Sequence, residues 1–438
     1  MYGDELTIVY DSYSILKTGM DQTGEKLPLT FKMGAGRPAG YVYGSLPFVA
    51  LWGTTELGVR GLSLASGLGI IVLMYFLGKK LFTKDIGLMA SFLTSISLWD
   101  IYLSRGGFEA HFALFLALFG VTLFLYEKYI PMAFFFGVSV FTYPTFKLTT
   151  PLIMFLLMFY SGFGKTIKNK SFAISIAILS IFALFTLKET FRGVSESRFL
   201  DLNVLSSNKE YITQKINEQR FLSTLPEEIK PLIYNKPYMY SRILIDNYVE
   251  NLSPSFLFLR GDLNPRHNPG EWGMLYLFEL PLLLIALYEM VKNRDKKIMF
   301  LFAWIMIVPL ATMLMGQTHA LRNSFMLPPF VLISAFTLFK LSPKSKIFFF
   351  VLFLLQLLLV LVNLYTFVPY KFDSFWSGEA KRASLKAIVD SKNNDVTLSN
   401  KIDNIEYAYP VYAKINPIEV ITQYGKFPKV YGRVTIVN

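Results

Sequence analysis

The chain has 438 residues, of which 53% are hydrophobic and only 17% are charged. Soluble globular domains carry about 25% charged residues, so this composition argues against a soluble protein and indicates several membrane spans. The absence of cysteine excludes disulfide bonds, thiolate catalysis and cysteine metal sites, and three histidines are too few for a histidine-rich metal cage. The net charge of +12 would suit a nucleic-acid partner, unless the basic residues follow the membrane topology.

Ten runs are long or apolar enough to cross a bilayer, which predicts an all-α polytopic membrane protein. The fourth and fifth runs are short, and Pro144 between them predicts a turn. The runs lie near residues 57–78, 86–103, 108–126, 129–143, 147–161, 171–188, 272–290, 298–316, 323–339 and 347–369.

The loops between these runs differ in their basic residues. One set of loops holds 14 Lys and Arg residues, whereas the short loops on the opposite side hold only Arg105, Lys147 and Arg322. Because basic loops remain on the cytoplasmic side, the first set is predicted to be cytoplasmic. The net charge then reflects topology rather than nucleic-acid binding.

This topology divides the chain into a first extracytoplasmic region (1–56), a transmembrane domain (57–369) and an extracytoplasmic tail (370–438). The long loop 189–271 within the transmembrane domain is also predicted to lie outside. Because residue 1 is predicted to lie outside and no span precedes it, we expect one more transmembrane helix upstream of Met1.

Two of the outside regions have a recognisable local pattern. Residues 5–17 carry an amphipathic stripe and residues 38–52 begin with proline, so both are predicted to be helices that lie in the outer interface. The tail contains helix-like and strand-like stretches and ends in the apolar "VYGRVTIVN". We therefore expect a small α/β domain there, and a truncated C-terminus stays open.

Residues that suit sugar-phosphate chemistry gather on this predicted outer side. Arginine binds phosphate with a planar fork, and a carboxylate can take a proton from a hydroxyl. A lipid-linked phosphosugar would need both at this depth. The residues are Asp4, Glu5, Arg37, Arg105, Glu109, Arg260, Asp262, Arg266, His267, Glu271, His319 and Arg322.

Several short segments resemble those of one enzyme family. They are "GDE…YDSYSILKTG", "ELGVRGLSLASG", "SRGGFEAH", "FLFLRGDLNPRHNPG" and "HALRNSFMLPP". In this order, over residues 2–370, they resemble the GT-C superfamily of membrane glycosyltransferases. The closest likeness is to bacterial glycosyltransferase family 39, relatives of the protein O-mannosyltransferases and the lipid A aminoarabinose transferase. The resemblance implies a cavity open to the outer leaflet and a sugar donor on polyprenyl monophosphate.

The resemblance also implies roles for three residues. Asp4 matches the Asp of the first-loop Asp-Glu motif, the catalytic base, and Glu109 matches the acidic position of the second outer loop. Arg37 stands where many relatives have Lys before Pro, which implies a contact with the donor phosphate. Arginine is a fork and lysine a point charge, so the geometry of that contact is open.

The other charged residues receive roles from their chemistry. Glu5 would orient Asp4 or bind the acceptor. The arginines would neutralise the leaving phosphate, and the histidines would contact the acceptor or a divalent metal, although no spacing demands a metal. The arginines are Arg105, Arg266 and Arg322, and the histidines are His267 and His319.

These assignments have alternatives. Asp4 and Glu5 can simply cap the first helix, because acids favour helix N-termini. Arg105 and Arg322 can reach lipid headgroups without binding a substrate. A membrane transporter or lipid-linked sugar flippase is an alternative function, but transporters place ionisable groups near the bilayer centre, where this sequence offers only Glu279. A non-catalytic scaffold that presents the tail outside is a third alternative.

The sequence therefore predicts a polyprenyl-phosphate-dependent glycosyltransferase of the cytoplasmic membrane, with its active site outside. Its partners would be the lipid-linked donor, membrane lipids and an acceptor hydroxyl or amine on a protein, polymer or lipid, and no nucleic acid. A phosphate already activates the sugar, so no redox cofactor is required, and the need for a divalent metal stays open.

Overall fold

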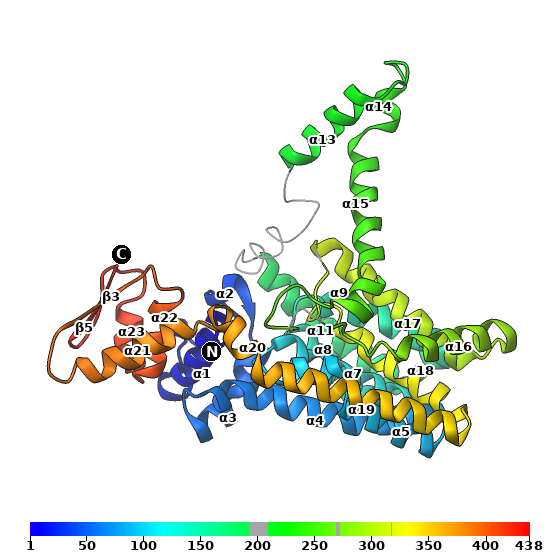
Figure 1. Cartoon of the computed structure of the whole chain (residues 1–438), viewed down its shortest axis with the longest axis horizontal. Coiled ribbons are helices and arrows are strands. Elements are labelled where there is room, and N and C mark those ends of the chain that lie inside the picture. The colour runs from blue at the N-terminus through cyan, green and yellow to red at the C-terminus, as the bar shows by residue number, and fades with distance from the viewer. Residues whose placement is uncertain (192–208, 269–271, 317) are drawn as a thin grey trace.

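The computed structural model describes residues 1–191, 209–268, 272–316 and 318–438. Long helices run side by side through most of the molecule (Figure 1). Both chain ends lie at one end of this bundle, where the N-terminal helix meets the C-terminal helices and strands (Figure 1).

Within the described residues, four helices are long and apolar enough to cross a membrane. A fifth crossing results if α5 (Lys84–Ser95) and α6 (Leu98–Ser104), which meet at a bend of 53°, form one broken span. The four long helices are α4 (Glu56–Leu81), α11 (Lys170–Phe191), α17 (Lys296–Thr312, followed by the 3₁₀ helix η2, Met313–Met315) and α19 (Pro343–Thr366).

The remaining predicted spans also contain helices, but shorter ones. α16 (Glu279–Asn293) begins later than the predicted start at residue 272, because the Glu279 carboxylate accepts a hydrogen bond from the Tyr276 N–H and closes the first turn there. The number of crossings therefore stays a prediction. The other short helices are α7 (Glu109–Leu125), α8 (Tyr129–Val140), α9 (Phe146–Ser161), α10 (Phe163–Ile167), α18 (Leu327–Lys340) and the 3₁₀ helix η3 (Ser324–Met326).

The long loop predicted at 189–271 is largely helical where the structure describes it. Its helices form an arm that projects away from the bundle (Figure 1). Residues 192–208 and 269–271, and with them Glu271, lie outside the described residues. The elements are α13 (Lys209–Leu222), α14 (Lys230–Ile233), α15 (Lys236–Glu250) and the π-helix η1 (Ser255–Leu259).

The first region contains both predicted helices, α1 (Gly3–Thr18) and α3 (Gly40–Trp52). Between them, strands β1 (Thr30–Phe31) and β2 (Arg37–Pro38) pair antiparallel around α2 (Met33–Gly36). α1 is more buried than an amphipathic pattern indicates, and its expected place in the outer interface stays a prediction. Residues 5–12 of α1 are all buried, because α3, α4 and the tail pack against this helix.

The tail has helices and strands at the predicted residues, and helix α21 covers the predicted stretch "GEAKRASLKAIVD". β3 and β5 are parallel, and β4 pairs with β5 antiparallel, which gives a sheet of order β3-β5-β4. The elements are α20 (Val368–Lys371), the 3₁₀ helix η4 (Asp373–Trp376), α21 (Gly378–Asp390), β3 (Val396–Ser399), α22 (Ile405–Tyr412), α23 (Pro417–Thr422), β4 (Lys429–Tyr431) and β5 (Val434–Val437).

A hydrophobic core joins the tail to the first region. Leu6 and Val9 of α1 share this core with Ala408 and Tyr409 of α22, although some 400 residues separate them in sequence. The Tyr10 hydroxyl adds a hydrogen bond of 2.9 Å to a backbone carbonyl of the tail. Apolar burial of this kind contributes about 25 cal/mol per Å² and holds the start of α1 against the tail.

Asp11, in the middle of α1, is buried with one carboxylate oxygen unpartnered among the described residues. Burial raises the pKa of Asp11 to about 7, although hydrogen bonds from Gln22 oppose this. The native state therefore holds a proton that the unfolded chain releases near pH 4, so the stability falls as the pH rises from about 4 to 7, by up to about 1.4 kcal/mol per pH unit.

We expect Asp11→Asn to remove this loss, so that the variant is more stable than the wild type at pH 8 and gains little at pH 4. Thermal unfolding of detergent-solubilised protein across this pH range measures the effect. Asp246→Asn, at a side chain that is 71% exposed, is the control. Equal pH slopes for the two variants would contradict the prediction.

Candidate functional site

The acidic pair at the start of α1 has two different surroundings. Glu5 Oε2 accepts the Tyr2 N–H at 3.3 Å and so closes the first helical turn. Asp4 instead uses its Oδ1 atom to accept a hydrogen bond of 2.7 Å from Arg37 Nη2. Glu5 therefore acts in part as a helix cap, whereas the Asp4 carboxylate binds Arg37.

Arg37, which follows α2, collects three partners from three parts of the chain. Its Nε donates to Glu109 Oε1 at 2.7 Å, its Nη1 to the Thr7 hydroxyl at 2.8 Å, and its Nη2 to Asp4. The Arg37 side chain is fully buried and the Glu109 side chain is 8% exposed, whereas the Asp4 side chain is 40% exposed. The cluster thus presents one carboxylate, Asp4, to solvent.

The guanidinium of Arg37 is occupied by protein partners, and the phosphate contact that the resemblance implies stays a prediction. Burial alone would lower the pKa of Arg37, but the carboxylates of Asp4 and Glu109 raise it, so the guanidinium stays charged. All three of its nitrogens already donate to protein oxygens. Its geometry suits an internal clamp for two carboxylates.

Glu5 belongs to a second buried cluster. Arg60, five residues into α4, binds both Glu5 oxygens, with distances of 2.7 and 2.8 Å from Nε and Nη2. The Gly107 N–H donates to Glu5 Oε1 at 2.8 Å, and the Arg60 guanidinium lies 5.0 Å from the centre of the Trp376 ring. Glu5 thus ties α1 to α4, to the turn before α7, and to the tail.

Arg60 is not among the site residues predicted from the sequence. Its place inside an apolar run could have identified it, because a charged residue there is costly unless it has a partner.

His111 and Asp100 form another buried pair, in which His111 Nε2 lies 3.0 Å from Asp100 Oδ1. His111 lies in the first turn of α7 and Asp100 in the first turn of α6, so this pair links the two helices.

The exposed side of Asp4 faces a cavity of about 360 Å³. Tyr2, Thr7 and Met33 line it together with Arg266 and with Tyr407 of the tail. Arg266 lies over the Tyr2 ring at 4.7 Å and donates its Nε to the Phe375 carbonyl at 2.7 Å. The structure therefore brings one predicted carboxylate and one predicted arginine to the same cavity.

Arg105, directly after α6, makes no hydrogen bond or ion pair within the part of the chain that the structure describes. Burial, and to a lesser extent the charge of Arg60, lowers the pKa of Arg105. Burial and the charge of Arg60 both disfavour the charged guanidinium of Arg105, so an anion bound beside it would stabilise that charge.

A larger cavity, of about 800 Å³, is lined in part by Pro265, the residue before Arg266. Arg260, His319 and Arg322 line it, and Phe375, which accepts the hydrogen bond from Arg266, lines it too. Arg322 also donates its Nη1 to the Met315 carbonyl. Of the arginines predicted from the sequence, Arg266 lines the cavity of Asp4, and Arg260 and Arg322 line the larger cavity. Arg37 and Arg105 line neither of these two cavities.

His267 and His319 meet at Asp262, and the possible ligand atoms of these three residues lie within 4.8 Å of one another. Two imidazoles and one carboxylate are a donor set that suits zinc. Asp262 Oδ2 also accepts the His267 Nδ1 hydrogen at 3.0 Å and the Ala320 N–H at 2.7 Å. Burial opposes it, but the hydrogen bond from His267 helps to lower the pKa of Asp262. The hydrogen bonds of Asp262 to His267 and to the Ala320 N–H also link two loops of the chain.

Comparison with known proteins identifies the fold. No family model and no curated protein matches the chain. ArnT from Cupriavidus metallidurans bound to undecaprenyl phosphate matches 96% of the chain at 13% identity with a TM-score of 0.51, over 65% of its own length. The oligosaccharyltransferase of Archaeoglobus fulgidus in the apo form matches 93% of the chain at 14% identity with a TM-score of 0.50, over 60% of its own length.

The chain therefore spans less than two thirds of each of these two proteins. Identities of this size carry no residue-level argument, but the match covers nearly the whole chain. It confirms the resemblance seen in the sequence at the level of architecture, because the chain shares the fold of ArnT and of the Archaeoglobus fulgidus oligosaccharyltransferase.

Proposed function

We propose that this protein transfers a sugar from a polyprenyl phosphate to an acceptor hydroxyl or amine. The observation that carries the proposal is the cavity in which the exposed Asp4 carboxylate, clamped by buried Arg37, faces Arg266. A base and a cation around one cavity are what transfer from a sugar phosphate requires. The GT-C fold, seen in ArnT bound to undecaprenyl phosphate, supports this choice.

Asp4 is the general base of the proposed reaction. Its Oδ1 atom is held by Arg37, and its Oδ2 atom makes no hydrogen bond within the described residues, so Oδ2 can accept the acceptor's proton. The acceptor oxygen or nitrogen bonds to the anomeric carbon as the bond from that carbon to the phosphate oxygen breaks. The electron pair leaves with polyprenyl phosphate, and the proton passes to Asp4.

The developing negative charge on the phosphate needs cations in a partly dry site. We assign this role to Arg266, which lines the Asp4 cavity, with Arg322 in the larger cavity and Arg105 beside Arg60 as further positive charges. Arg37 then positions Asp4 and Glu109 rather than binding the phosphate itself. A divalent ion held by the Asp262 cluster would add positive charge beside the cavity of about 800 Å³.

The positive-inside pattern supports a location in the cytoplasmic membrane with this site on the outer face. Most of the charged groups described above lie in the first region, in the turns predicted to lie outside or in the tail, whereas Arg60, Glu109 and the Asp100–His111 pair lie near the starts of α4, α6 and α7. This distribution favours an enzyme over a transporter or flippase, which would place ionisable groups near the bilayer centre.

The test is sugar transfer in lipid nanodiscs from a short-chain polyprenyl-phosphate sugar, followed by mass spectrometry of the lipid. Release of polyprenyl phosphate, by transfer or by slow hydrolysis, is the expected result. Movement of intact donor between the leaflets of a proteoliposome without release of polyprenyl phosphate would instead support the flippase.

A further inference from the structure

A cavity of about 370 Å³ lies between α1, α2 and the tail, next to the cavity of Asp4. Met33 and Tyr407 line both cavities, so these two side chains lie at the border between them. Asp4, Thr7 and Tyr10 follow one another at three-residue spacing on one face of α1. The first two line the Asp4 cavity and Tyr10 lines the second one, about 9 Å further along the helix.

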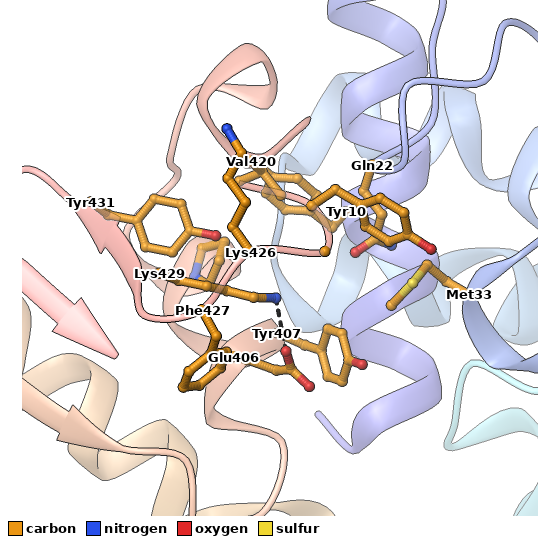
Figure 2. A pocket seen from close by; sticks show the side chains of 13 residues that line it. Tyr10, Gln22, Met33, Glu406, Tyr407, Val420, Lys426, Phe427, Lys429 and Tyr431 are labelled. Atoms are coloured by element: carbon orange, nitrogen blue, oxygen red, sulfur yellow. Dashed lines mark hydrogen bonds and ion pairs between the residues drawn. The ribbon is translucent and has the colours of Figure 1, made fainter. Parts of the chain in front are cut away.

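The second cavity is rich in aromatic rings. Figure 2 shows the rings of Tyr10, from α1, and of Tyr407, Phe427 and Tyr431, from the tail, around one space. Tyr424 of the tail is the fifth aromatic residue that lines the cavity. Four of the five are tyrosines, which offer an apolar face and a hydroxyl on the same side chain. Tyr407 and Tyr424 can stack on the C–H faces of a sugar and offer their hydroxyls to it. Tyr10 and Tyr431 are only 2% and 3% exposed and form the inner wall, and the Tyr10 hydroxyl already bonds to the Ile415 carbonyl.

The charged groups of the cavity are largely neutralised. Lys429 Nζ binds Glu406 Oε2 at 2.7 Å, and Figure 2 shows this pair beside Phe427. Lys426 remains as a third charged side chain at the cavity. A paired, mainly neutral lining suits a neutral ligand rich in hydroxyl groups better than a lipid phosphate or a strongly charged peptide.

We infer that this second cavity, lined by Tyr10, Tyr407 and Tyr424, binds a saccharide acceptor whose end reaches Asp4. The inference rests on the proposed function and specifies the class of its acceptor. A sugar chain in the second cavity would direct its terminal hydroxyl across Met33 and Tyr407 toward Asp4 Oδ2. The tail thereby contributes half of the acceptor site rather than serving only as a cover.

Tyr424 is 47% exposed, so Tyr424→Ala removes a ring at the rim without opening the core. Calorimetry on wild-type protein in nanodiscs, with cellotetraose, chitotetraose and mannotetraose as probes, is expected to detect binding of at least one tetrasaccharide. Tyr424→Ala should weaken this binding about tenfold and Tyr424→Phe should largely restore it. Tyr370→Ala, at an 85% exposed tyrosine outside this cavity, is the matched control.

The inference is overturned if none of the three saccharides binds, or if Tyr424→Ala binds them as tightly as the wild type. It is also overturned if a serine- or threonine-containing peptide binds in their place and loses affinity in Tyr424→Ala. Donor turnover without any acceptor is measured separately on the wild type. Its absence would count against the proposed glycosyltransferase, whereas saccharide binding is scored independently of it.

Discussion

Asp4→Asn is expected to lower sugar transfer by about 10²- to 10⁴-fold, because it removes the group that accepts the acceptor's proton. The substitution keeps an oxygen that can accept the hydrogen bond from Arg37 Nη2, so the shape of the cluster should survive. The loss should appear in kcat at saturating donor and acceptor, with little change in the melting temperature. The measurement is release of polyprenyl phosphate in nanodiscs.

Asp373→Asn is the matched control for this experiment. Like Asp4, Asp373 has a 40% exposed side chain paired with an arginine, Arg382, at 2.8 Å, but it lies outside the Asp4 cavity. Its activity should stay close to that of the wild type. If Asp4→Asn retains wild-type transfer while folded, Asp4 is not the base and the proposed mechanism fails.

Arg37→Met is expected to destabilise the protein by about 3–5 kcal/mol, the usual cost of removing one partner from a buried ion pair. The change would leave Glu109 without its cation in a buried position and would free Asp4. Arg37→Lys should recover part of the stability, because a lysine keeps the charge but cannot bond to Asp4, Thr7 and Glu109 in the same geometry.

Arg382→Met provides the comparison, since the Arg382 side chain is 67% exposed and its pair with Asp373 has a similar length. Exposed pairs contribute about 0–1 kcal/mol, so this variant should unfold almost like the wild type. Thermal unfolding followed by tryptophan fluorescence compares the two. Equal stability of Arg37→Met and Arg382→Met would show that the buried cluster is not a structural clamp.

The same variants separate the two roles considered for Arg37. If Arg37 positions Asp4, folded Arg37→Lys should have a lower kcat, because the Asp4 carboxylate is no longer held in place, and a nearly unchanged KM for the donor. A raised donor KM with unchanged stability would favour the direct phosphate contact that the family resemblance implies.

Local patterns in the sequence located helices in every predicted span and in the tail, but not α13, α14 and α15, which lie in the predicted long loop. Each predicted span contains a helix, and α21 and β3 of the tail lie where their patterns placed them, because apolar periodicity reports which face of an element is buried. The sequence also named Asp4, Arg37 and Glu109, through their place on the predicted outer side and the roles that the family resemblance implies. The outer position of these residues rests on loop charge and remains a prediction.

The tertiary structure decided which of these residues meet. Arg37 lies 72 residues from Glu109 and Arg60 lies 55 residues from Glu5, and no local pattern encodes such pairs. The same holds for the tail, which shares a hydrophobic core with α1 and buries more of this helix than its amphipathic pattern indicates. Periodicity depends on neighbours within one or two turns, whereas ion pairs and cavities depend on how whole helices pack, so the sequence determined the elements and their chemistry and the fold determined their partners.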